Sequence, residues 1–203
     1  MVVGLFGCGP TDGTTVPVLG NPGEYNKALA DAESLSKIGM EKIAKDEELN
    51  ADEKKNLVKA ANLFEGLAAY ETTNFAPHLA LGMIYRGLGN LDVAERHLQQ
   101  CLLNLPGADT PDVRETAAEA HYQLARVLFD RQEFDKSLAE ASTACESSPS
   151  NPNYIVARAS ALLQLKREED ARVELGKALA LDPENRRGLG LKKLLAKPST
   201  AGA

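Results

Sequence analysis

The chain has 203 residues, of which 26% are charged and 43% hydrophobic, and its formal net charge at pH 7 is −6. This length suits a single domain with a real hydrophobic core. An acidic chain gains little free energy from counterion release on a polyphosphate, so the composition disfavours generic nucleic-acid binding. The three cysteines are too few and too dispersed for a disulfide scaffold or a zinc finger, and no apolar run is long enough to span a bilayer.

Residues 1–23 are rich in Gly, Pro and Thr and contain neither Lys nor Arg. Such a segment cannot bury enough apolar surface to fold by itself, so we expect a flexible tether. Its glycine spacing is only weakly similar to that of a phosphate-binding loop, because Thr14 follows Gly13 where the phosphate-binding Lys would stand. We therefore expect no nucleotide site in this segment.

The stretch Leu5-Phe6-Gly7-Cys8 resembles a bacterial lipoprotein box, in which an apolar and a small residue precede the cysteine that receives the lipid. The apolar run before Cys8 is short and no basic residue precedes it, so the segment resembles the last third of an export signal. The resemblance implies a start upstream of Met1 and a membrane anchor at Cys8, facing the periplasm or the cell exterior. The alternative is an arbitrary apolar N-terminus on a cytoplasmic protein.

From Glu24 to about Lys197 the apolar residues recur with a helical period, and no strand pattern occurs. Capping side chains, two of them followed by Pro at the first helical position, mark helix starts at Asn50, Thr110 and Asn151. Short gaps between helices fall at 89–90, 131–133 and 165–167. The pattern predicts antiparallel helical hairpins.

The predicted hairpins repeat along the chain. Pro106, Pro149 and Pro183 each end a helix, and the last two are 34 residues apart. Small residues recur at three fixed positions before each proline, where they let neighbouring helices approach closely. These small residues are Gly82, Ala94 and Cys101, then Ala125, Ser137 and Ala144, then Ala159, Ala171 and Ala178. The pattern resembles the tetratricopeptide repeat, a helical hairpin of 34 residues.

The resemblance implies an all-α fold, a tetratricopeptide-type α-solenoid of antiparallel hairpins within residues 24–197. The extra length between Pro106 and Pro149 is expected to form a loop and about two additional turns at the start of the helix that carries His121. A C-terminal capping helix would present its basic residues on its outer face, with a nucleic-acid patch as the alternative. The expected segments are a degenerate repeat at 41–74 whose first helix lies at 24–44, clear repeats at 75–108, 118–151 and 152–185, a cap at 184–197, and a disordered tail at 198–203.

The sequence offers no convergent set of catalytic groups. His78 and His121 occupy the same repeat position and are expected to pack between helices, whereas His97 is expected on the exposed side of its helix. Cys101 and Cys145 fall at buried repeat positions, where cysteine behaves as a small apolar residue. No metal-binding or nucleophile motif occurs. We therefore predict that the protein is not an enzyme and has no cofactor or metal.

The resemblance also implies that the first helices of successive hairpins line a concave groove. Tyr122 would be an amphipathic anchor there, and Arg86 and Arg126 would be donors to carboxylates. The Lys/Asn/Arg clamp of chaperone-binding family members is absent. We predict a non-catalytic module that binds a peptide or helical segment of another protein; the alternative is a self-associating or envelope-assembly scaffold. The groove residues implied are Met83, Arg86, Glu119, Tyr122, Gln123, Arg126, Phe129, Asn153, Ser160 and Leu163, with Ala76, Leu79 and Ala80 at further groove positions.

Overall fold

The computed structural model describes residues 15–196, so Cys8 lies outside the described residues. Within that range the regular secondary structure consists of nine α-helices and no strand. The predicted all-α fold of helical hairpins is confirmed. The chain divides into two compact units, Met1–Asn104 (unit 1) and Leu105–Ala203 (unit 2), which are described separately.

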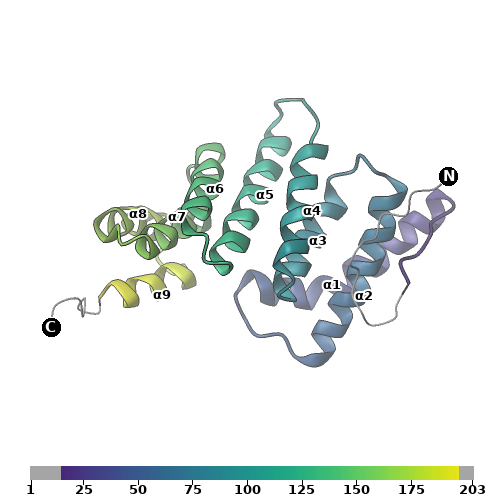
Figure 1. Ribbon diagram of the computed structural model, residues 1–203, viewed down its shortest axis with the longest axis horizontal. Coiled ribbons are helices and arrows are strands. Elements are labelled where there is room, and N and C mark those ends of the chain that lie inside the picture. Colours follow the sequence, from purple (N-terminus) through teal and green to yellow (C-terminus); the bar gives the residue numbers. More distant parts are fainter. Residues whose placement is uncertain (1–14, 197–203) are drawn as a thin grey trace. The chain divides into compact units, whose positions relative to one another are not determined.

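Unit 1 contains two hairpins (Figure 1). Its helices are α1 (Pro22–Ala44), α2 (Ala51–Tyr70), α3 (Ala76–Gly87) and α4 (Leu91–Asn104). α1 packs against α2 and α3 against α4, and α3 also packs against both helices of the preceding hairpin. Asn50 and Glu53 form the capping box that starts α2. Ahead of α1, Pro17 lies against Gly66 of α2, so the residues just before α1 contact this unit.

Unit 2 contains two hairpins and a final helix. Its helices are α5 (Pro111–Asp130), α6 (Phe134–Ser147), α7 (Pro152–Gln164), α8 (Glu168–Leu181) and α9 (Arg186–Leu195). α5 pairs with α6 and α7 with α8, while α9 packs against α7 and α8. α5 has 20 residues against 13 in α7, and Thr110 caps its start. The predicted additional turns at the start of the helix that carries His121 are confirmed.

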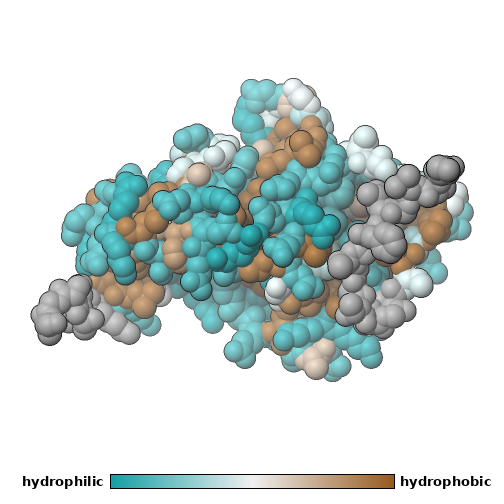
Figure 2. All heavy atoms as spheres, in the orientation of Figure 1, coloured by the Kyte–Doolittle hydropathy of each residue, from teal (hydrophilic) through white to brown (hydrophobic). Residues whose placement is uncertain are grey.

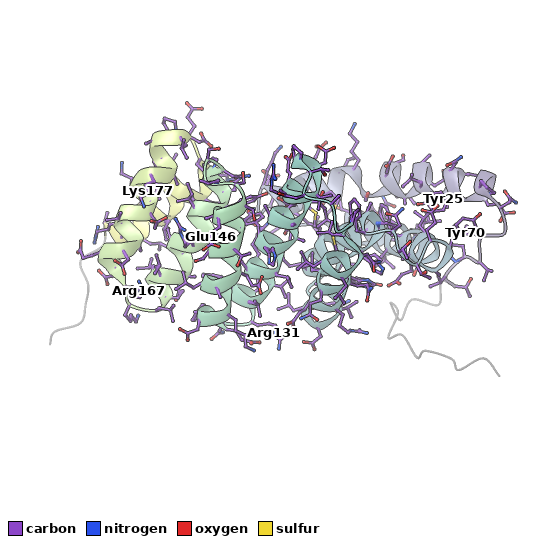
Figure 3. All side chains as sticks on the ribbon, turned by 90° about the horizontal axis from the view of Figure 1, so that it is seen from above. Tyr25, Tyr70, Arg131, Glu146, Arg167 and Lys177 are labelled. Carbon is purple, nitrogen blue, oxygen red and sulfur yellow. The ribbon has the colours of Figure 1, made fainter. Side chains whose placement is uncertain are left out.

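The same tight turn follows the first helix of every hairpin, and in the first hairpin three further residues, 48–50, separate this turn from α2. Directly after each turn, a backbone N–H donates to the carbonyl oxygen five positions back, at 2.8–3.0 Å. Arg131 and Arg167 flank two of these turns in unit 2 (Figure 3). One residue in each turn has a left-handed φ, between 53° and 82°: Asp46, Gly89, Gln132 and Lys166.

The small residues of the repeat pattern are all buried, as the sequence predicts. At Gly82 the two helices approach so closely that an added Cβ would lie 2.5 Å from the side chain of Leu98. Ser137 replaces the expected Ala, and its buried hydroxyl donates to the carbonyl oxygen of Ala125 at 2.8 Å. The hydroxyl is therefore accommodated without an unsatisfied polar group.

The surface of the described residues is mixed in character. On the face drawn in Figure 2, apolar side chains lie in separate patches among hydrophilic ones. Such a mixture is ordinary for a surface that faces water. In the described part of the chain, every helix is too short or too polar to cross a membrane.

Candidate functional site

A cleft of about 750 Å³ lies between α1 and α3 of unit 1. This volume is within the range of about 300–1,000 Å³ that is typical of ligand sites. The first helices of the hairpins, α1 and α3, supply most of its wall, and Phe64 of α2 contributes as well. Its apolar lining residues are Leu29, Met40, Ala44, Phe64, Ala76, Pro77 and Ala80.

The cleft occupies the groove positions of two successive repeats. Gly39 of α1 and Gly82 of α3 are 43 positions apart and have the same role, because a Cβ at Gly39 would lie 2.7 Å from Leu57 of the paired helix. The turn residues Asp46 and Gly89 have the same separation. Subtracting 43 from the groove positions of α3 gives the equivalent positions on α1, which are Glu33, Ser36, Lys37, Met40, Ile43 and Ala44. All of these except Ile43 line the cleft.

An aromatic pair lies at the N-terminal end of α1. The ring centroids of Tyr25 and Tyr70 are 5.4 Å apart (Figure 3), and the Asn74 amide donates to the Tyr25 hydroxyl oxygen at 3.1 Å. Burial, with the neighbouring Glu71 carboxylate, raises the pKa of Tyr25. Tyr25 therefore remains a neutral phenol in the cleft wall.

The uncharged polar side chains of the cleft are already hydrogen-bonded. The Ser36 hydroxyl donates to the carbonyl oxygen of Glu33 at 3.3 Å. The Asn74 amide nitrogen also donates to Glu71 at 2.9 Å, and its oxygen accepts from the N–H of Ala76 at 3.0 Å. The cleft therefore offers a ligand apolar surface and a charged edge rather than free amide groups.

Three predicted groove residues of unit 1, Leu79, Met83 and Arg86, lie outside this lining. Met83 is half-buried on α3. Arg86 lines a separate polar hollow of about 510 Å³ near the α1–α2 turn, where its Nη2 is 3.8 Å from Asp46 Oδ1. Leu29 and Met40 were not predicted from the sequence, because the first repeat was counted from residue 41. The spacing of Gly39 from Gly82 is the signal that could have placed α1 correctly.

The corresponding face of unit 2 is filled by its own side chains. Tyr122 and Gln123 of α5 are only 5% and 2% exposed. The ring of Tyr122 packs against Tyr154 of α7 with centroids 4.9 Å apart. Glu119 accepts hydrogen bonds from the Tyr154 hydroxyl at 2.9 Å and from Gln123 Nε2 at 2.6 Å. Burial, followed by the Glu119 carboxylate, raises the pKa of Tyr154, which therefore stays a neutral donor.

Two arginines complete this network in unit 2. The guanidinium carbon of Arg126 lies 5.5 Å from the centroid of the Tyr122 ring. Arg187 of α9 donates a hydrogen bond to the Tyr122 hydroxyl. The expectation that all basic residues of the final helix face outward is therefore wrong for Arg187. Its position near the start of α9 turns it toward α5, whereas Lys192 and Lys193 are exposed.

The remaining predicted groove residues of unit 2 contact their own chain. Phe129 packs against Phe134 with centroids 5.3 Å apart, and the Asn153 oxygen accepts from Asn185 at 3.1 Å. The Ser160 hydroxyl donates to a carbonyl one turn earlier, and Leu163 packs against the apolar cluster of α7, α8 and α9. Ligand binding by this face stays a prediction.

Two of the three histidines converge in unit 1, contrary to expectation. His78 Nδ1 and His97 Nδ1 are 3.0 Å apart. His97 Nε2 lies 3.2 Å from Glu65 Oε1, which also accepts from the Tyr85 hydroxyl at 3.2 Å. His97 is also stacked on the Tyr85 ring, so it is not on an exposed face. His97 and His78 occupy two repeat positions that face each other. In unit 2 the same two positions hold Glu140 and His121, and Glu140 Oε2 lies 2.7 Å from His121 Nδ1.

The environment of this cluster shifts two pKa values downward. Burial, followed by the neighbouring His97, lowers the pKa of His78. Burial by itself would raise the pKa of Glu65, but the hydrogen bond and charge of His97 and the hydrogen bond from Tyr85 outweigh it, so the pKa is lowered. Glu65 is therefore the charged acceptor at the centre of the cluster.

The described residues contain no cluster of three or more His, Cys, Asp or Glu arranged to hold a metal ion. Cys101 and Cys145 are buried, as their repeat positions predict. Burial raises the pKa of the Cys101 thiol to about 12 and also raises that of Cys145. Both thiols are therefore poor nucleophiles at neutral pH.

Paired helices with small residues at fixed contact positions define the class of helical-hairpin repeat proteins. The tetratricopeptide repeat family model matches residues 79–152 and 122–186, which together cover more than half of the chain. The chain belongs to the tetratricopeptide repeat family. Proteins of this family are generally non-catalytic interaction modules. No curated protein sequence matches the chain.

Solved structures with the same fold include MamA from Desulfovibrio magneticus RS-1, with a TM-score of 0.59 and 16% identity over 81% of this chain and 83% of that one. Another MamA crystal structure has a TM-score of 0.56 and 18% identity, covering 81% of this chain and 88% of that one. The APC/C hetero-tetramer Cut9–Hcn1 has a TM-score of 0.66 and 17% identity, over 86% of this chain but 32% of that one. At these identities the likeness concerns the fold.

Proposed function

We propose that the protein is a non-catalytic interaction module and that unit 1 binds a peptide or helical segment of another protein in the α1–α3 cleft. The observation that carries this proposal is the apolar cleft of about 750 Å³ at the groove positions of two successive first helices. Large apolar hollows rimmed by polar residues are typical of ligand and protein-binding sites.

The cleft and the filled face of unit 2 support different roles. A partner that enters the α1–α3 cleft displaces water from Leu29 and Met40 without breaking existing hydrogen bonds. A partner on the α5 face would have to compete with the bonds that join Glu119, Tyr122 and Tyr154. Binding in unit 1 is therefore favoured over binding by the groove residues predicted for unit 2.

The proposal is tested with a synthetic amphipathic helix of about 18 residues that carries one leucine-rich face. Titrated into the isotopically labelled chain, this peptide should shift amide resonances of α1 and α3 and leave those of α5 to α9 unchanged. Ala80→Phe fills the cleft and should weaken binding at least tenfold without lowering helicity.

A matched control is Ala139→Phe, which adds the same ring to an exposed position of α6. This variant should bind the peptide normally. Resonance shifts confined to α5 to α9, or binding that Ala80→Phe leaves unchanged, would contradict the proposal. The alternative is a self-associating or envelope-assembly scaffold. If a second copy of the chain fills the cleft, the chain is an oligomer that Ala80→Phe dissociates.

A further inference from the structure

Three charged side chains follow one edge of the α1–α3 cleft. Glu33, Lys37 and Glu41 all line the cleft and are exposed. They are four residues apart on α1, so each is about 6 Å along the helix from the next. Among the described residues, Lys37 and the two carboxylates form no ion pair within 4.0 Å. The edge therefore presents an acidic, a basic and an acidic charge in fixed order.

The hydrogen-bonding groups that line the cleft favour a helical ligand over an extended peptide. An extended peptide needs partners for its backbone N–H and C=O groups, and a buried group without a partner is costly. The walls of the cleft are helices whose backbone groups bond internally, and the Ser36 and Asn74 side chains are already engaged. A helix satisfies its own backbone and needs only an apolar face and a charged edge.

The length of the cleft sets the size of this helix. Residues from Tyr25 to Ala44 line it along α1, which corresponds to about 28 Å of helix. A partner helix of about 18 residues lying alongside α1 covers that length. It would place residues at four-residue spacing opposite Glu33, Lys37 and Glu41.

We infer that the cleft selects an amphipathic helix from a partner protein in which a basic, an acidic and a basic residue follow one another at four-residue spacing beside the apolar face. This inference rests on the proposed function of the cleft. Because the charge order is symmetric, it pairs with α1 whether the partner helix runs parallel or antiparallel. The apolar face provides affinity, and the order of the charges provides specificity.

Three synthetic 18-residue helices with the same leucine-rich face test the inference. Their edge positions carry Lys–Glu–Lys, Lys–Lys–Glu or Glu–Lys–Glu at four-residue spacing. The first two have identical composition and net charge, so a difference between them measures charge order rather than attraction to an acidic protein. We expect the Lys–Glu–Lys helix to bind about tenfold more tightly than Lys–Lys–Glu, with the Glu–Lys–Glu helix weakest.

Reversing the protein charges should reverse this preference. The triple variant Glu33→Lys, Lys37→Glu, Glu41→Lys keeps the same spacing of opposite charges on α1 and should bind the Glu–Lys–Glu helix best. The matched control is Lys27→Glu with Asp31→Lys, which exchanges two exposed charges of α1 outside the cleft lining. The control should keep the original order of affinities.

The outcomes separate the two proposals. Equal binding of the first two helices, with all binding lost in Ala80→Phe, would overturn the charge-order inference and leave the proposed function standing. Absence of binding by all three helices would overturn both. A full-length chain that sediments as a dimer and becomes monomeric in the triple variant would overturn the inference in favour of a second copy as occupant.

Discussion

Units 1 and 2 are built from the same hairpins, yet their first helices present different surfaces. Ser36 of α1 and Pro77 of α3 occupy the repeat positions that Tyr122 of α5 and Tyr154 of α7 occupy in unit 2. The small side chains leave the cleft open, whereas the two rings pack against each other and, with Glu119, fill the corresponding space. The comparison shows that the repeat backbone sets where a groove forms, while side-chain length decides whether it stays open.

Removing the aromatic ring that fills unit 2 should have the largest effect. Tyr122→Ala deletes a buried ring and removes the contacts that Tyr154 and Arg187 make with it, so we expect a loss of about 3 kcal/mol in the stability of unit 2. Hydrogen exchange should show lost protection in α5, α7 and α9 and unchanged protection in α1 to α4. Tyr70→Ala, at a partly exposed ring of unit 1, is the control and should cost much less. Unchanged exchange in Tyr122→Ala would mean that the α5 face is an open surface.

The next largest difference is expected when the same Ala→Phe substitution is made in each unit. Ala171 is fully buried in a close contact of unit 2, so Ala171→Phe should destabilise the protein by about 1–3 kcal/mol. Ala80→Phe places its ring in the open cleft and should change the free energy of unfolding by less than about 0.5 kcal/mol. Urea unfolding of both variants measures the difference. Equal losses would show that the cleft is packed shut in solution.

Acidification should weaken unit 1 through its histidine cluster. Burial lowers the pKa of His78 below 6.5 in the folded state, so the unfolded state binds more protons there. The stabilisation is fully present above pH 6.5 and is lost as the pH falls below it, with a slope of at most about 1.4 kcal/mol per pH unit for each proton. Glu65, whose pKa is lowered from 4.5, acts in the same direction at lower pH.

The measurement is the free energy of unfolding, or the exchange protection of α3 and α4, between pH 8 and pH 5. His78→Ile introduces the residue type found at the same repeat position in Ile155 and should flatten the dependence near pH 6. A variant with the same pH dependence as the parent chain would assign the effect to other groups.

Much of the fold follows from local sequence signals. The caps at Asn50, Thr110 and Asn151, and the short turns after α3, α5 and α7, were predicted because each depends on a few neighbouring residues. The burial of Gly82 and Ala171 was predicted because the repeat fixes which face of a helix meets its partner. The additional turns at the start of α5 followed from the spacing of Pro106 and Pro149.

The candidate site was harder to predict from the sequence than the fold. The groove positions on α3 were predicted through Ala76 and Ala80, but those on α1 were missed because the long α1–α2 connection shifts the repeat count. His97 and Arg187 were assigned to exposed faces because helical periodicity describes one helix at a time. Both side chains lie at the edge of a buried stripe, and only the neighbouring helix decides whether such an edge is covered.

The sequence by itself determined that this protein is a set of tetratricopeptide hairpins, since helix starts, turns and close contacts depend on residues near each other in the chain. The tertiary structure decided which first-helix face is open and which is filled. That choice depends on side chains from α1 and α3, or from α5, α7 and α9, meeting across helices far apart in sequence, and their fit is a property of packing in three dimensions.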